Sequence, residues 1–221
     1  IPDIAAILQS SNLYVYCGSD PVNRIDLTGD NWFTDCWENV KWAFKTLGGY
    51  ANEAQKAVQR SVWAAGAQKY LREQKQYLTS AWMLEHSLQN NPSDIWRGND
   101  SRIAYLINHD NNFSAKVNEA ILKSDGNILD NVKIGVTFNA EDLYYSIHKS
   151  TINLTGYKRR DGSWIIHCIL TDTYDFTEVQ SFMGDGGGAS LGTVANDAAY
   201  ISQKMGAIKS YEVTVDFWIT R

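Results

Sequence analysis

The spacing of apolar residues changes from a helical to a strand period along the chain. In the first half, apolar side chains recur every three or four residues, as they do on one face of a helix. Near the end, Val213, Val215, Phe217 and Ile219 alternate with other residues, which is the period of a half-buried strand. Helices first and strands later favour an α+β fold, with a helical N-terminal half followed by a small antiparallel sheet and a packed helix.

The helical half is expected to run from Asn31 to about Lys123. Residues 51–89 lack proline and are rich in Ala, Gln, Lys, Glu and Leu, so they predict one long helix, or two with a kink near Gly66. Shorter helices are expected over residues 101–108 and 114–122.

The second half carries the signals of a hairpin. Thr151–Lys158 and Ser163–Thr171 flank residues 159–162, which end in Asp-Gly and predict a tight turn. A short helix ending at Ile147 is expected before the hairpin, with residues 139–142 as its N-cap and acidic first turn. Another is expected from about Leu191 to Met205, ahead of the last strand.

The charge balance disfavours functions that require binding to nucleic acid. The net charge is −5, and the one tight basic cluster, residues 158–160, falls in the expected hairpin turn. Proteins that bind nucleic acid need a basic surface to displace counterions from phosphates, so we expect no nucleic-acid partner. No run of 18 apolar residues occurs, so we expect no transmembrane helix.

The cysteines do not form a recognisable framework. Cys17, Cys36 and Cys168 are odd in number and lack a CxxC spacing. A disulfide network or a zinc site is therefore disfavoured, and buried free thiols are expected.

A short segment near the start resembles a known family. Asn12-Leu13-Tyr14-Val15-Tyr16, then Asp20-Pro21-Val22-Asn23, then Ile25-Asp26-Leu27-Thr28-Gly29 are similar to the end of the RHS repeat-associated core. In that family the motif ends a β-cage, and the core can be cut nearby to release the domain on its C-terminal side. Leu27 stands where the family has proline, so the sequence does not decide whether, or exactly where, this chain is cut.

The resemblance implies two parts and a biological context. Residues 1–30 would end the core, and residues 31–221 would form a variable C-terminal toxin domain used in interbacterial competition. Such a domain would be secreted or delivered into a target cell. It would have a cognate immunity protein as its partner.

The densest polar group lies at the end of the second hairpin strand. Asp172, Tyr174 and Asp175 place two carboxylates around a tyrosine, a set that can serve as acid and base or hold Mg²⁺ or another divalent cation. In a regular strand Asp172 and Tyr174 share a face and Asp175 points the other way. A bend at Tyr174 would be needed to gather all three.

This D-x-Y-D fragment also resembles the active-site motif of colicin M-like bacteriocins. Those enzymes hydrolyse the lipid-linked peptidoglycan precursor and need magnesium, so Asp172, Tyr174 and Asp175 would be the matching positions, with Asp172 and Asp175 as metal ligands. The family continues with His-Arg five residues later. Here no histidine follows His167, and the only arginine after Asp175 is Arg221.

Two histidines are candidates to support this group. His167 lies five residues before Asp172, and His148 lies just before the first hairpin strand. Either can act as a base if the chain brings it to the carboxylates.

Three functions are consistent with these features. The first is an enzymatic toxin, a metal-dependent hydrolase of a lipid-linked or small-molecule substrate. The second is a toxin that disrupts membranes through its helical half and its tryptophans. The third is a non-catalytic cap that binds or closes the RHS protein.

Overall fold

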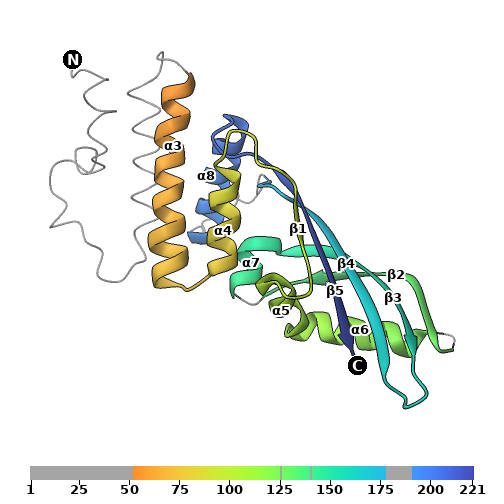
Figure 1. Cartoon of the computed structure of the whole chain (residues 1–221). Helices are drawn as coiled ribbons and strands as arrows, with labels where there is room; N and C mark the ends of the chain where they lie inside the picture. The colour runs from red at the N-terminus through yellow and green to blue at the C-terminus, as the bar shows by residue number, and fades with distance from the viewer. Residues whose placement is uncertain (1–51, 125, 140, 178–190) are drawn as a thin grey trace, which may run out of the picture.

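The structure, a computed structural model, describes residues 52–124, 126–139, 141–177 and 191–221 (Figure 1). Its helical elements are α3 (Asn52–Gly66), the π-helical segment η2 (Ala67–Gln74), α4 (Leu78–Ser87), α5 (Arg102–Asn108), α6 (Asn111–Lys123), α7 (Glu141–Ile147) and α8 (Leu191–Lys204). Its strands are β1 (Ile95–Arg97), β2 (Ile128–Thr137), β3 (Lys149–Lys158), β4 (Trp164–Tyr174) and β5 (Tyr211–Thr220).

The strands form one five-stranded sheet in the order β1-β5-β4-β3-β2. The pairs β2–β3, β3–β4 and β4–β5 are antiparallel, and the short β1 runs parallel to β5. The expected α+β class is confirmed, and the sheet is mixed rather than wholly antiparallel because of β1. Neither β1 nor β2 was expected from the sequence.

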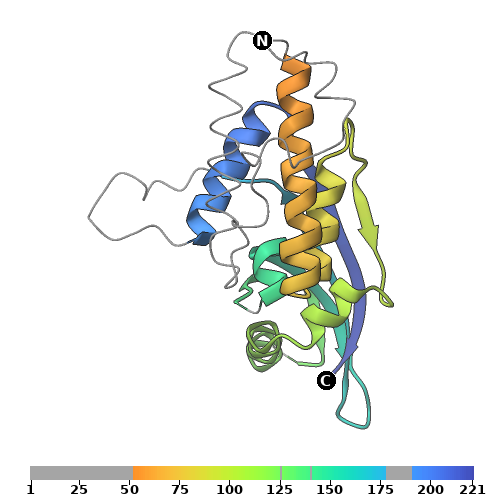
Figure 2. The same ribbon diagram turned by 90° about the vertical axis from the view of Figure 1, so that its left-hand side faces the viewer.

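One face of the sheet carries the main core. Helices α4 to α7 gather on this face, as Figure 2 shows. Phe113 and Val117 of α6 are fully buried against strand residues such as Phe217, whose ring lies 5.8 Å from that of Phe113. Burial of such large side chains stabilises the fold by about 1.5–3 kcal/mol each.

A second, smaller core lies among the helices. Trp63 and Leu71 pack there with Ala198 and Ala199 of α8, and Trp63 Nε1 donates to Ser202 Oγ at 2.9 Å. Helix α4 joins the two cores, because Met83 belongs to the sheet core and Leu84 to the helical one. Segments α3, η2 and α8 therefore pack on α4, outside the layer of helices that covers the sheet.

The expected break near Gly66 is confirmed in a modified form. The α-helical hydrogen bonding of α3 ends at Gly66 and continues as the π-helical η2. The chain then turns at Gln76, whose φ of 60° lies in the left-handed region, before α4 begins at Leu78. Residues 32–47, expected to be helical, lie outside the described residues.

Asp142 connects two helices. Its buried carboxylate accepts hydrogen bonds from the backbone N–H groups of Thr79 (3.0 Å) and Ser80 (2.8 Å) at the start of α4. Arg102 Nε lies 3.5 Å from the same carboxylate. The sequence predicted that Asp142 would stand in the first turn of its own helix, which it does, but its side chain caps α4 instead.

The hairpin is confirmed, and its strands are longer than expected. Asp161 accepts from the backbone N–H of Ser163 at 2.9 Å, and Gly162 has a φ of 90°. Cys168 of β4 is buried and free, as expected, and burial raises the pKa of its thiol to about 12. Cys17 and Cys36 lie outside the described residues. So do residues 1–30, which were expected to form the end of an RHS core.

Gly156 allows β3 and β4 to approach closely. A Cβ atom at this position would collide with the backbone carbonyl of Ile165 and lie 3.0 Å from Ile166 Cα. We predict that Gly156→Ala lowers the free energy of unfolding by roughly 1–3 kcal/mol, because the backbone of β4 must shift. The measurement is urea unfolding of the full chain.

Gly135→Ala is the matched control. A Cβ atom at Gly135, on the neighbouring strand β2, meets nothing within 4 Å. Its effect should stay within about 0.5 kcal/mol. Equal losses in both variants would show that strand propensity, rather than the close approach, governs the cost.

Candidate functional site

The strand β4 determines which way each candidate side chain points. Its pairing with β3 and β5 runs without a bulge, so its side chains alternate strictly between the two faces. Asp172 and Tyr174 therefore share the core-facing side, as the sequence predicts for a regular strand. His167 lies on the opposite side.

Asp172 is held at the end of β4 by a residue of β3. Ser150 Oγ donates to Asp172 Oδ2 at 2.9 Å and also lies 3.2 Å from the carbonyl oxygen of Ile147. Ser150 is buried, and Asp172 is half-buried in a face that is otherwise apolar. The carboxyl group is thus partly removed from water and has one fixed side-chain partner.

Burial raises the pKa of the Asp172 carboxyl group above its usual range. The hydrogen bond from Ser150 opposes this change, and the negative charge of Asp175 adds to the increase. Ser150 can serve both forms of the carboxyl group. It donates to the carboxylate, or it accepts from the protonated acid while donating to Ile147 O. Such a group can exchange a proton without losing its partner.

Asp175 follows the end of β4 and is exposed. The next residue, Phe176, is held by Gln203 of α8, whose Oε1 accepts from Phe176 N at 3.0 Å and whose Nε2 donates to Phe176 O at 3.4 Å. Asn196 of the same helix donates to Thr177 O at 2.7 Å. Helix α8 therefore fixes the backbone on the far side of Asp175.

Tyr174 anchors the segment on the near side. Its side chain is buried, and its ring stacks on that of Tyr211 at 5.2 Å and meets Phe176 edge-on at 5.4 Å. Burial strongly raises the pKa of its hydroxyl group, so Tyr174 stays protonated near neutral pH. This geometry suits an anchor of the strand end better than a proton acceptor.

His148 lies on the surface, two residues before Ser150. Its ring is tilted against Tyr144, with centroids 4.5 Å apart. Tyr144 meets Tyr145 edge-on, and Tyr145 stacks on Tyr77, so an aromatic row leads from His148 across α7. The backbone carbonyl of His148 accepts from Phe138 N at 2.7 Å, which fixes the chain there.

His167 is not brought to the carboxylates. Because β4 is regular, the five residues between His167 and Asp172 span about 17 Å and end on opposite faces. His167 Nε2 instead lies 2.6 Å from Asp216 Oδ1, and the imidazole stacks on Trp218. The bend that would gather His167 with Asp172 does not occur.

The carboxylates fit one kind of metal binding. Within the described ranges, no group of three or more His, Cys, Asp or Glu side chains is placed to hold a metal ion. Mg²⁺ commonly takes only one or two carboxylates and completes its shell with water and substrate phosphates. Asp172 and Asp175 are compatible with that mode, and a closed metal site is not formed by these residues.

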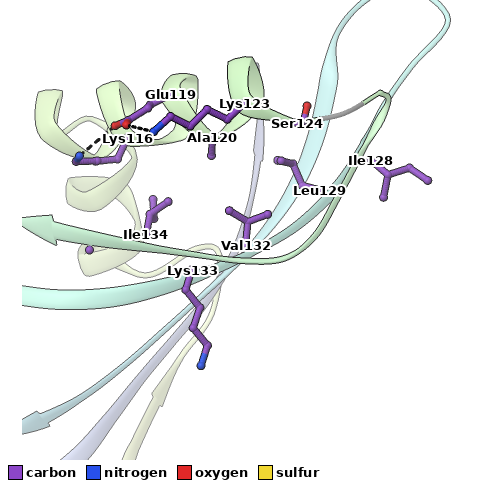
Figure 3. Close-up of a pocket in the computed structure, with 11 residues that line it drawn as sticks. Lys116, Glu119, Ala120, Lys123, Ser124, Ile128, Leu129, Val132, Lys133 and Ile134 are labelled. Carbon is purple, nitrogen blue, oxygen red and sulfur yellow. Dashed lines mark hydrogen bonds and ion pairs between the residues drawn. The ribbon is translucent and has the colours of Figure 1, made fainter.

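A groove lies at the other end of the sheet, between α6 and β2 (Figure 3). Its volume is about 510 Å³, and its floor includes Leu129 and Ile134. Lys116 and Lys123 both bind Glu119, at 3.0 and 2.6 Å, and hold the pKa of that carboxyl group down to about 2. No histidine lines the groove, and the one hydroxyl there, Ser124 Oγ, donates to the carbonyl oxygen of Ile121 at 2.7 Å, so we place no chemistry there.

Three residues of the candidate region were not expected from the sequence. Ser150 and Asp216 each contact a candidate residue from another element, and Gln203 bonds to the backbone of Phe176, next to Asp175. Alternation in the last strand places Asp216 on the outer face, so the sequence alone predicts which way its side chain points. The partners of Ser150 and Gln203 depend on tertiary register, which the local sequence does not encode.

Comparison with known proteins gives a weak likeness to a solved structure. Neither a protein-family model nor a curated protein matches the chain. A truncated form of the bacteriocin syringacin M from Pseudomonas syringae pv. tomato DC3000 aligns over 100% of this chain and 96% of its own, with 11% identity and a TM-score of 0.32. Values this low do not define a common fold, and no property of that bacteriocin is transferred on this basis.

The ionised Asp172 should lower the free energy of unfolding at neutral pH. A folded-state pKa above the unfolded value means that stability is present at low pH and is lost as pH rises through the folded pKa. We predict that Asp172→Asn unfolds at a higher urea concentration than the native chain at pH 7, with the difference shrinking toward pH 4. Asp100→Asn, at an exposed position, is the control. A lower urea midpoint for Asp172→Asn at pH 7 would contradict the assigned cause.

Gln203 should control the order of the segment around Asp175. We predict that Gln203→Ala increases amide hydrogen exchange at residues 175–177 at least about tenfold, since both backbone bonds of Phe176 are lost. Exchange in β4 itself should not change. Gln74→Ala, at an exposed position of η2, should leave the segment unaffected. Unchanged exchange in Gln203→Ala would show that packing of Phe176 alone fixes the segment.

Proposed function

We propose that the chain is the toxin-bearing end of an RHS-type protein and that residues 31–221 form an enzymatic domain with a hydrolase site around Asp172 and Asp175. The resemblance of residues 12–29 to an RHS core end supports the toxin context. The resemblance of Asp172, Tyr174 and Asp175 to the colicin M-like motif supports a lipid-linked peptidoglycan precursor as substrate. Delivery outside the producing cell and a cognate immunity protein belong to the same proposal.

One observation carries the choice of site. Asp172 is a half-buried carboxyl group with a raised pKa at the end of a strand, next to an exposed second carboxylate. Burying such a group opposes folding, and stability is commonly sacrificed in this way where a protein needs chemistry. The fixed backbone on both sides of Asp175 supplies the second requirement, which is a defined position.

The two environments suggest separate roles. Asp172, which retains a proton to higher pH, would donate it to the oxygen of the leaving group as the phosphate ester bond breaks. Asp175 would accept a proton from the attacking water as its oxygen forms the new bond to phosphorus. The proton lost by one carboxyl group and gained by the other balances the hydrolysis. Ser150 would orient Asp172 in both states.

With both carboxyl groups ionised, Asp172 and Asp175 would instead hold a divalent cation, which would neutralise the negative charge of the substrate phosphates. Asp172 cannot carry the proton and bind the cation at once, so its roles as acid and as metal ligand are alternatives. His148 would contact substrate at the surface near β3, with the aromatic row of α7 beside it. Tyr174 acts as an anchor in this scheme. His167 takes no part in the reaction, because it lies on the other face of the sheet.

The membrane-disrupting alternative is less well supported. No helix in the described part of the chain is long and apolar enough to cross a membrane. Trp63 is buried, and Trp82 packs against the sheet core and under the Arg97 guanidinium group, so both are occupied in folding. Trp32, Trp37 and Trp42 lie outside the described residues.

The proposal is tested by directing the full chain to the periplasm or to the cytoplasm of a sensitive bacterium. We predict growth arrest on periplasmic delivery and at least about a hundredfold recovery of viable cells when Asp172→Asn and Asp175→Asn are combined. The readout is colony counts at matched protein levels.

The matched control combines Asp100→Asn and Asp130→Asn, two exposed positions away from the end of β4. This control should kill as the native chain does. Killing by the Asp172/Asp175 variant would remove the site. Leakage of dye from liposomes treated with the native chain would favour membrane disruption instead, and no arrest in either compartment would favour a non-catalytic cap.

A further inference from the structure

The face of the sheet opposite the core carries a compact group of side chains, which we name the outer-face cluster: Trp96, His167, Asp216 and Trp218. Alternation along β4 and β5 directs His167, Asp216 and Trp218 away from the helices. Trp96 of β1 pairs with Thr214 and lies on the same face. The core helices of the described ranges all pack against the other face (Figure 2).

Three members of the cluster are fixed to one another. His167 Nε2 lies 2.6 Å from Asp216 Oδ1, and the imidazole stacks on the indole of Trp218 at 4.4 Å with an interplanar angle of 9°. The backbone N–H of Trp218 donates to Asn99 Oδ1 at 2.9 Å, which keeps the chain after β1 beside this part of β5. The side chains are therefore held in place at an exposed position.

Trp96 extends the cluster along the strand. A Cβ atom at Gly98 would lie 3.2 Å from Cη2 and 3.3 Å from Cζ3 of Trp96, so the indole lies over Gly98. Continuing the parallel register by two residues places Gly98 beside Asp216. Asp216 is thus flanked by Trp96 on one side and Trp218 on the other.

Both indoles remain open to solvent, with 62% of Trp96 and 54% of Trp218 exposed. The surrounding outer-face residues include Thr155, Thr171 and Thr214, together with the partly exposed Ile169 beside Asp216, so the two rings are the most exposed apolar surfaces of the cluster. One oxygen of Asp216 bonds to His167, and its carboxylate can accept further donors. The cluster combines flat apolar surfaces with directional acceptors.

These features match a ligand with apolar faces and hydroxyl edges. A pyranose ring presents C–H groups on its faces, which stack on indole, and hydroxyl groups around its rim, which donate to a carboxylate. A phosphate would be repelled by Asp216, and an apolar protein surface would offer no donor to the carboxylate oxygen of Asp216 that His167 does not bind. We propose that the outer-face cluster is a binding site for a neutral saccharide, separate from the Asp172 site.

The test measures binding of two neutral tetrasaccharides, cellotetraose and the β-1,4-linked tetramer of N-acetylglucosamine, to the full chain by isothermal titration calorimetry. We expect at least one to bind. Trp96→Ala should then weaken binding tenfold or more, as should Asp216→Asn, because each removes a separate part of the cluster. Trp218→Phe should retain most of the affinity, since a ring remains to stack.

Tyr144→Ala is the matched control, because Tyr144 is an exposed aromatic residue of α7, which packs on the core-facing side of the sheet. It should bind as the native chain does, and so should Asp172→Asn, which separates this proposal from the hydrolase site. The proposal is overturned if neither tetrasaccharide binds at millimolar concentration, or if Trp96→Ala binds unchanged. It is also overturned if the chain self-associates through this face and Trp96→Ala disperses the assembly.

Discussion

The regular alternation of β4 governs the placement of every candidate residue. Hydrogen bonding to β5 as far as Tyr174, and to β3 as far as Thr171, keeps the strand regular, so residues two apart share a face. Asp172 and Tyr174 must therefore face the core, and His167 must face outward. A one-residue shift of register would exchange these sets and place charged groups in the core.

The end of β4 lies where the two cores meet. Phe176 packs against both the sheet core and the helical core, and Gln203 fixes its backbone. Asp142 adds a further connection, because its carboxylate joins α7 to the start of α4 and α4 contributes to both cores. The half-buried Asp172 and the exposed Asp175 thus lie at a junction that is held on several sides, and such a defined position is what catalysis requires.

Local sequence patterns predicted the helices and strands better than they predicted the contacts between them. The hairpin, the last strand and the helices near residues 101–123 follow from periodicity and turn residues, and all occur. The short β1 lies in a segment without strand periodicity and gains its place from pairing with β5. The sequence predicted the carboxylate group but not Ser150 or Gln203, because their partners are set by register and helix docking. It also left the bend near Tyr174 open, which depends on the pairing of β4 with β5 as far as Tyr174 and Tyr211.

The missing His-Arg pair changes the electrostatics that a phosphate substrate would meet. The only arginine after Asp175 is Arg221, and its guanidinium group donates to Asn108 Oδ1 at 3.0 Å beside Trp164, at the opposite end of β4. It cannot approach Asp172 while the sheet is intact. A phosphate group brought to Asp172 and Asp175 would then face two carboxyl groups with no neighbouring arginine to offset them. The proposed hydrolysis would therefore depend more strongly on a divalent cation than it would with a basic residue in place.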